Sequence, residues 1–127
     1  MGYVKVKVKV RGIQPPKKET EIQLLADTGA IYTMISSEQL KELGVKPTGK
    51  RNFKTADGRI IQRQVGIAEV EIKGQITHSI IVFGEKEDVQ VLGVTTLEEL
   101  GLQVDPVTGE LKPLELLLLL LDRQRSK

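Results

Sequence analysis

Asp27-Thr28-Gly29 lies between two apolar runs, and no other feature constrains the fold of this chain as strongly. Leu24-Leu25-Ala26 precedes it, and the apolar residues that follow are Ile31, Met34 and Ile35. If these flanks are buried strands, the carboxyl group of Asp27 lies at the floor of a site and is partly shielded from water. Thr28 can donate a hydroxyl hydrogen bond beside the acid, and Gly29 allows the backbone to turn closely under it. The stretch therefore predicts a catalytic loop, with an ordinary Asp-Thr-Gly turn as the alternative.

Composition narrows the chemistry that such a loop could support. The chain has 127 residues and no cysteine, which removes disulfides, thiolate zinc sites and a cysteine nucleophile. His78 is the only histidine, so we expect it to have a structural or exposed role and predict no metal site. Aromatic residues make up 3% and the net charge of +2 comes from dispersed basic residues, so nucleic acid is not an expected partner. No cofactor is expected.

The two ends of the chain suggest where it acts. The N-terminus lacks the charged-then-apolar profile of a signal peptide, so we expect a cytoplasmic location. Leu114 to Leu121 is apolar except for Glu115, and it is too short to span a bilayer as a helix. We expect one domain over residues 1–113, followed over 114–127 by this strip and a basic tail. The strip would dock on its own core or form a subunit interface, the latter being favoured over contact with a membrane surface.

Alternation and turn signals predict mostly strands. Alternating valines and lysines predict a half-buried strand over Tyr3 to Arg11, and a second strand over Glu19 to Leu25 follows a proline loop. Hairpins are expected to turn at Ala56-Asp57-Gly58-Arg59 and at Lys73-Gly74. The remaining expectations are a loop over Val45 to Gly49, a strand over Val89 to Gly93 and a hairpin turning at Asp105 to Gly109.

Capping signals predict two short helices. Ser36 and Gln39 have the spacing of a capping box, which would begin a helix over Ser37 to Leu43 that Gly44 ends. Thr95 to Glu98 has the same spacing, and Gly101 would end that second helix. Each predicted helix follows a strand and ends in Leu-Gly. This parallel indicates a degenerate internal repeat with an acid in the first copy only.

These features together resemble the retropepsin-like aspartic proteases, which include the retroviral proteases and the protease domain of DNA-damage-inducible ubiquitin-shuttle proteins. The resemblance rests on Leu24 to Ala30, on the hairpin around Ala56-Asp57-Gly58-Arg59, and on Val91-Leu92-Gly93 leading into a helix. It covers nearly the whole chain in the family's order. It implies an all-β, single-domain acid protease barrel with two short helices. One departure is Val94, which stands where retroviral enzymes carry an Arg.

The resemblance implies a homodimer, and the acids of the sequence lead independently to the same expectation. Aspartic protease chemistry needs two carboxyl groups that share a proton, because like charges at contact distance cannot both ionise. Only Asp27 has the required setting, since the other aspartates lie in turns, in a charged loop or in the tail. The second carboxyl group is therefore expected from Asp27 of a symmetry mate.

By resemblance, the chain is an aspartic endopeptidase in which one Asp27 acts as base on a water and the other protonates the peptide carbonyl. Thr28 would link the two catalytic loops across the dimer, and Gly29 would offer backbone groups to an extended peptide. Residues 55–60 would form a flap that closes over the substrate. The implied substrate-binding residues are Ala30, Ile31, Tyr32, Met34, Ala56, Asp57, Gly58, Val89 and Val91. The alternative is a dimeric peptide-binding module of the same fold that cuts little or nothing.

Overall fold

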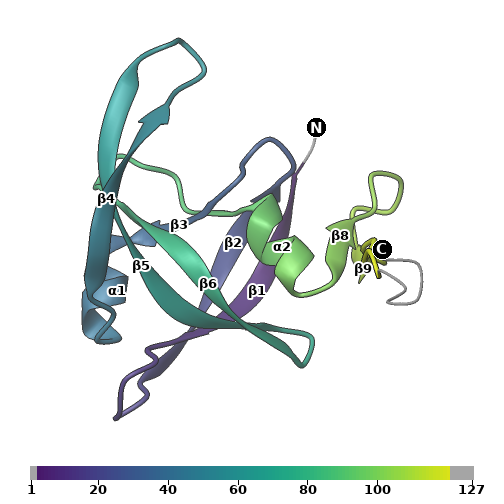
Figure 1. The fold of residues 1–127 in the computed structure, drawn as a ribbon, viewed down its shortest axis with the longest axis horizontal. Helices are drawn as coiled ribbons and strands as arrows, with labels where there is room; N and C mark the ends of the chain where they lie inside the picture. The colour runs from purple at the N-terminus through teal and green to yellow at the C-terminus, as the bar shows by residue number, and fades with distance from the viewer. Residues whose placement is uncertain (1–2, 121–127) are drawn as a thin grey trace, which may run out of the picture.

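The computed structural model describes residues 3–120, and in this range the chain forms nine strands and two short helices (Figure 1). The main sheet has seven strands in the order β1-β2-β7-β3-β6-β5-β4, and β1 also pairs with β5. This extra pairing closes six of the strands into a barrel and leaves β4 outside the ring. The sheet is mixed, because the β2–β7 and β3–β6 pairs are parallel and the other pairs are antiparallel. The predicted mostly-β fold with two short helices is confirmed.

The barrel begins with the strand that alternation predicts. On β1 (Tyr3–Arg11), Val8 and Val10 are fully buried, while the intervening lysines are exposed. β1 pairs along its whole length with β2 (Glu19–Asp27), which buries Ile22, Leu24 and Ala26 in the same core. Burial of these apolar side chains fixes the register of the pair, because a slip of one residue would turn the valines out to solvent. β2 consequently ends at Asp27.

Two linked hairpins form the side of the barrel that carries β4. β4 is Pro47–Lys54, β5 is Ile60–Ile72 and β6 is Gln75–Gly84. The turns at residues 55–59 and 73–74 lie where the sequence predicts them. The predicted loop over Val45 to Gly49 is wrong in its second half, because β4 already begins at Pro47. A proline is tolerated there since the first residue of a strand need not donate to the ladder.

Two short strands precede the two helices. β3 (Thr33–Ser36) leads into α1 (Ser37–Glu42), and β7 (Val91–Leu92) leads through Gly93 into α2 (Val94–Glu99). The Ser36 hydroxyl accepts from the Gln39 amide at 3.2 Å, as a capping box requires. A full capping box would also have the Ser36 amide donating to the Gln39 side chain. Here the Ser36 amide donates instead to the Gln90 side chain at 2.8 Å.

The second predicted capping box, Thr95 to Glu98, is wrong. The residue that caps α2 is Gly93, which offers no side-chain bond. Thr96 is fully buried, and its hydroxyl bonds other side chains of the core. The helix ends are predicted correctly, since Gly44 and Gly101 follow the helices with φ of +77° and +70°. Both helices therefore end in Leu-Gly, as the proposed internal repeat predicts. Only the first helix begins with the predicted side-chain cap.

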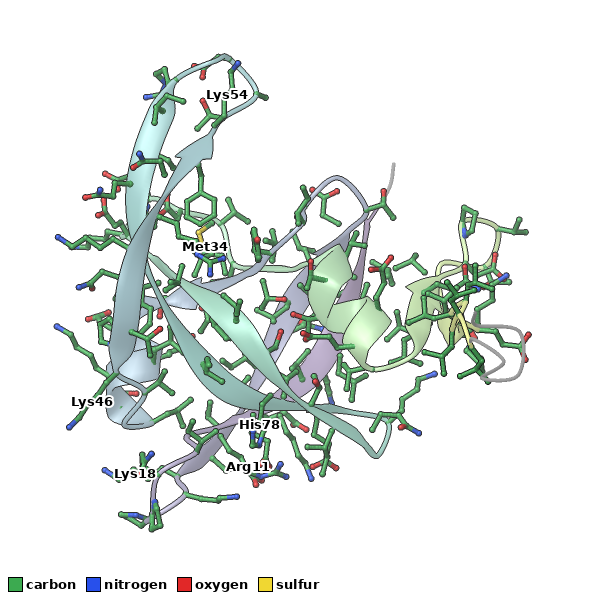
Figure 2. The ribbon with its side chains drawn as sticks, in the orientation of Figure 1. Arg11, Lys18, Met34, Lys46, Lys54 and His78 are labelled. Carbon is green, nitrogen blue, oxygen red and sulfur yellow. The ribbon has the colours of Figure 1, made fainter. Side chains whose placement is uncertain are left out.

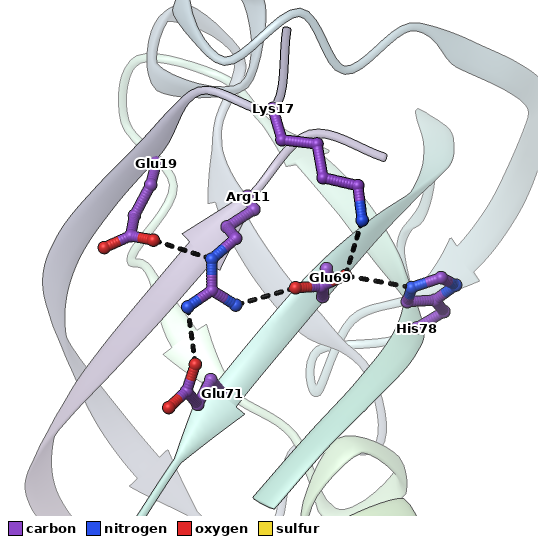
Figure 3. Close-up of polar contacts among 6 residues, drawn as sticks. All are labelled: Arg11, Lys17, Glu19, Glu69, Glu71 and His78. Atoms are coloured by element: carbon purple, nitrogen blue, oxygen red, sulfur yellow. Dashed lines mark hydrogen bonds and ion pairs between the residues drawn. The ribbon is translucent and has the colours of Figure 1, made fainter. Parts of the chain in front are cut away.

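An ion-pair cluster outside the barrel ties β1 to β5 (Figure 3). The Arg11 guanidinium contacts Glu19 at 2.6 Å and Glu69 at 2.7 Å, and it also pairs with Glu71. His78 Nε2 lies 3.2 Å from a Glu69 oxygen, while its side chain remains 56% exposed. Arg11, and after it His78, holds the pKa of Glu69 below its ordinary value. The single histidine thus makes a contact on the outer surface of the barrel.

The chain leaves the barrel after α2. β8 (Leu102–Val104) and β9 (Leu111–Pro113) form the predicted hairpin as a separate two-stranded sheet beside α2 (Figure 1). Leu114 donates its amide to Gly101, and beyond it Leu116 to Leu120 are 55–97% exposed. Leu121 and the predicted basic tail lie outside the described residues. No helix in the described part of the chain is both long enough and apolar enough to cross a membrane.

Candidate active site

Asp27 is the last residue of β2, and the loop that follows it holds its side chain in place. The parallel pairing of β2 with β7 places Leu25 beside Val91 and Ala26 beside Leu92, just before the acid. The Gly29 amide donates to Asp27 Oδ1 at 2.9 Å, and the Ala30 amide donates to the Asp27 carbonyl at 3.0 Å. Asp27 is half-buried, whereas Thr28 and Gly29 are exposed. One carboxylate oxygen is thus oriented by the loop itself.

The first turn of α2 supports this loop from behind. The amides of Val94 and Thr95 donate to the carbonyls of Ala30 and Ile31 at 2.8 and 3.0 Å. Gly93 lies so close that a Cβ atom there would be 2.4 Å from the Tyr32 carbonyl carbon and 2.6 Å from the Ile31 oxygen. Only glycine allows these two chain segments to meet. The sequence pattern that places a glycine after β7 therefore has a steric reason.

A chain of buried hydroxyl groups joins the end of the loop to the core. The hydroxyl oxygens of Thr33 and Thr96 are 2.6 Å apart, and that of Ser79 is 2.8 Å from Thr96. The Gly93 amide donates to the Thr33 hydroxyl at 2.8 Å. These residues were not predicted from the sequence. One signal could have found them: each of the three residues is a Ser or Thr inside an otherwise apolar or helical segment. A hydroxyl group buried in such a segment needs a hydrogen-bond partner.

A groove of about 550 Å³ lies between the loop and the β4–β5 hairpin. In Figure 2, Met34 lies beneath this hairpin, and Lys54 lies near its turn. Six of the predicted substrate-binding and catalytic residues line the groove, namely Gly29, Ala30, Ile31, Tyr32, Met34 and Val91. The hairpin and β6 contribute further lining residues. Thr55 belongs to the predicted flap, and the others were not predicted from the sequence; they are Asn52, Phe53, Lys54, Ile61, Arg63 and Val82.

An aromatic pair connects the hairpin to the loop side of the groove. The rings of Tyr32 and Phe53 meet edge to face, with centroids 5.9 Å apart and planes at 74°. The Arg51 guanidinium carbon lies 6.0 Å from the centroid of the Tyr32 ring, and its Nη1 is 3.5 Å from the tyrosine hydroxyl. These contacts fix how the base of the hairpin sits over the groove. The sequence alone could not identify Phe53 as a groove residue, because that requires knowing which strand faces the Asp27 loop.

The turn of the hairpin is organised around a carboxylate. Asp57 accepts from the Thr55 hydroxyl, from the Arg59 amide at 3.3 Å and from Arg59 Nε at 3.0 Å. The Thr55 hydroxyl first, and then the Arg59 amide, lower the pKa of Asp57. Gly58 supplies the positive φ of +90° that the turn needs.

Six predicted residues are not among those that line the groove of a single subunit. Asp27 and Thr28 directly precede the lining residue Gly29. Ala56, Asp57 and Gly58 are at the hairpin turn, beyond the lining residues, and Val89 is 61% exposed in the segment before β7. Among the described residues that line the groove there is no Asp or Glu. Within residues 3–120 no cluster of three or more His, Cys, Asp or Glu side chains could hold a metal ion. One chain thus brings one oriented carboxyl group to the end of an apolar groove.

The sequence matches a known protein family over more than half of its length. Residues 17–99 match the family model described as gag-polyprotein putative aspartyl protease. The matched range contains the Asp27 loop, the β4–β5 hairpin and the whole of α2. A search of curated proteins found no matching sequence.

Proposed function

The chain belongs to the gag-polyprotein putative aspartyl protease family, which is retropepsin-like, and from this premise we propose that it is an aspartic endopeptidase active as a homodimer. The observation that carries the proposal is the setting of Asp27. Its carboxylate is oriented by the amide of Gly29, which itself lines a groove of about 550 Å³ whose described lining residues include no acid. A second carboxyl group has to come from elsewhere, and a two-fold axis beside the loop would supply Asp27 of the partner.

In the proposed reaction the two Asp27 side chains share one proton, because two adjacent carboxylates cannot both stay ionised. The ionised group takes a proton from a water whose oxygen attacks the peptide carbonyl carbon, and the other Asp27 gives its proton to the carbonyl oxygen. Collapse of the tetrahedral species then breaks the C–N bond. The proton taken from the water goes to the leaving amine, and a hydroxyl of the tetrahedral species returns its proton to the other Asp27 as the new carbonyl forms. Thr28, which is exposed in a single subunit, would link the two loops across the axis.

The substrate side of the proposal follows from the groove. Tyr32, Met34 and Val91 offer apolar surface for side chains of an extended peptide, while the exposed Gly29 offers backbone groups for its main chain. The β4–β5 hairpin would close over the peptide and exclude water, with Ala56, Asp57 and Gly58 at its tip. Closure would also bring these three residues toward the groove.

The strip after β9 completes the proposed dimer. We place the protease domain at residues 1–113 and assign residues 114–127 to the subunit interface. Leu117 and Leu119 are 97% and 79% exposed, and in water such a run of leucines favours association. Contact of the strip with a membrane surface is the competing role. Flotation of the chain on liposomes, with and without residues 114–127, separates the two roles.

Cleavage of a mixed peptide library by Asp27→Asn and by the parent chain tests the proposal. We expect cleavage at acid pH that falls faster than linearly on dilution as dimers dissociate. Asn at position 27 cannot exchange the proton, so its rate should fall by about 100-fold or more. Glu21→Gln is the matched control, because it makes the same carboxyl-to-amide change at an exposed position of the same strand.

Two results would contradict the protease proposal. If parent and Asp27→Asn are equally inert while both elute as dimers and retain peptide, the fold serves as a peptide-binding module. If both cleave equally, the nucleophilic water is activated by another group.

A further inference from the structure

Arg51 carries a positive charge that no carboxylate within residues 3–120 neutralises. On the β4–β5 ladder Arg51 lies directly opposite Arg63, and like charges in opposed positions disfavour pairing. Arg63 is compensated by Asp88 at 2.8 Å and by Glu85 at 3.7 Å. Among the described residues, no carboxylate lies within 4 Å of the Arg51 guanidinium. The unfavourable pairing of Arg51 therefore has no compensation within residues 3–120.

The position of Arg51 places this charge at the rim of the groove. Its guanidinium packs against the Tyr32 ring and reaches the tyrosine hydroxyl at 3.5 Å. Tyr32 and its edge-to-face partner Phe53 both line the groove. Arg51 is itself exposed, and a guanidinium has five donors, of which the tyrosine contact uses one. The remaining donors are accessible to a ligand that lies along the groove.

The surroundings of Arg51 favour an anionic ligand. β4 contains three basic residues, Lys50, Arg51 and Lys54, and no acid. The described lining of the groove also contains no acid, and its two charged members, Lys54 and Arg63, are both basic. A peptide carboxylate near Arg51 would thus be attracted by Arg51 and Lys54, whereas the charge of Arg63 is already compensated by Asp88, and no lining residue would repel it. A planar guanidinium held by an aromatic ring is also preorganised for bidentate binding of a carboxylate.

Building on the proposed function, we propose that Arg51 is a specificity-determining residue that binds the carboxylate of a Glu or Asp side chain in the substrate. The acidic residue flanks the apolar residue that lies against Tyr32 and Phe53. The substrate class is therefore an extended peptide in which an acidic side chain stands near the apolar side chains at the cleaved bond. This role differs from support of the Tyr32 ring, which would affect all substrates equally.

Paired peptides test the role of Arg51. The peptides differ only by Glu or Gln at one of the four positions on either side of the cleaved bond, and kcat/KM is measured at about pH 6, where Glu is ionised. We expect the parent to prefer Glu at one position by about two- to fivefold, the range of an exposed charge pair. Arg51→Gln should bring the ratio of kcat/KM for the Glu and Gln peptides close to one, because the partner of the peptide carboxylate is removed. Arg51→Lys should retain part of the preference.

Lys50→Gln is the matched control, because it removes a neighbouring charge on the same strand at a position that pairs with Gln64. It should leave the Glu preference intact. Raising the salt concentration should weaken the preference of the parent. A parent that shows no preference at any position overturns the proposal, and so does an Arg51→Gln variant that loses equal activity on both peptides.

Binding to the Asp27→Asn protein separates this proposal from the protease function. Fluorescence anisotropy with labelled Glu and Gln peptides measures affinity without any cleavage. If the parent does not cleave but the Glu peptide binds more tightly in an Arg51-dependent way, the protease function fails and the role of Arg51 stands. If the parent cleaves and affinities for the two peptides are equal in both backgrounds, the role of Arg51 fails and the protease function stands.

Discussion

At the scale of single residues, Gly93 decides how the loop and α2 fit together. A Cβ atom at this position would meet backbone atoms of Ile31, Tyr32 and Thr33 at 2.4–2.7 Å, and backbone cannot rotate away as a flexible side chain can. We expect Gly93→Ala to lower the free energy of unfolding by about 2–3 kcal/mol, as overpacking does elsewhere. Urea denaturation measures the change. Peptide cleavage should fall as well, because the displaced backbone carries Asp27.

Gly49→Ala is the control for that experiment. Gly49 also lies in a strand, but among the described residues no atom lies within 4 Å of the place a Cβ would take, and its φ is not positive. The substitution should change stability by less than about 0.5 kcal/mol. If the two variants unfold at the same urea concentration, the close contact between Gly93 and the loop is not needed for the fold.

At the scale of elements, Arg11 joins β1 to β5 and thus closes the barrel at one end. Arg11→Gln would leave Glu69 and Glu71 beside each other without their shared partner. We expect the free energy of unfolding at neutral pH to fall by about 1–3 kcal/mol, the usual cost when a charged hydrogen-bond partner is removed. Lys7→Gln is the control, since Lys7 is exposed on the same strand and lies opposite the neutral Gln23.

The same contacts set the pH dependence of stability. Arg11 lowers the folded-state pKa of Glu69 from its ordinary 4.5, and Arg63 lowers that of Asp88 from its ordinary 3.8. A lowered carboxyl pKa stabilises the fold above the ordinary value, and that stabilisation is lost as the pH falls through the lowered value. We therefore expect stability to be level above pH 4.5 and to decrease below it. The decrease should be smaller in Arg11→Gln, and thermal unfolding at a series of pH values measures both.

A result opposite in sign would contradict this account. If Arg11→Gln were more sensitive to acid than the parent, Glu69 and Glu71 would not be the groups whose protonation destabilises the fold.

At the scale of the whole molecule, the leucines after β9 are the largest run of exposed apolar side chains in the described chain. We expect the double change Leu117→Lys and Leu119→Lys to weaken the proposed dimer by at least about tenfold in Kd, because it would place charge in an apolar interface. Monomer stability should change by less than about 0.5 kcal/mol, since neither side chain packs in the core. Sedimentation velocity at several concentrations measures the dimer.

Val107→Lys is the control for the leucine pair. Val107 is 90% exposed in the β8–β9 turn, so it tests whether any exposed apolar residue matters. If all three proteins dimerise equally, residues 114–120 are not the interface. Loss of liposome binding in the leucine variant alone would assign the strip to a membrane surface instead.

The local structure around the candidate site was predictable from sequence, whereas the contacts that depend on distant segments were not. Asp27 at the end of a strand, the turn of the β4–β5 hairpin and the glycines that end both helices were predicted because neighbouring residues determine them. Phe53 and Arg51 were missed, because their importance comes from packing against Tyr32 across the groove. The start of α2 was misplaced for a related reason, since Thr96 bonds Thr33 and Ser79 in the core.

Alternation of valines with lysines and the glycines at tight turns predicted, from sequence alone, the first strand, the hairpin turns and the helix ends, while the family resemblance rested on the motif Leu24 to Ala30 and the segments that follow it. These signals are local, because a strand repeats every two residues and a helix every 3.6. Only the tertiary structure decided which carbonyls of the Asp27 loop accept hydrogen bonds from α2 and which hairpin residues line the groove. It also decided that Arg63, and not Arg51, has a carboxylate partner among the described residues. Those outcomes depend on contacts between segments far apart in the chain, such as Gly93 with Tyr32 and Arg63 with Asp88, and no local pattern records them.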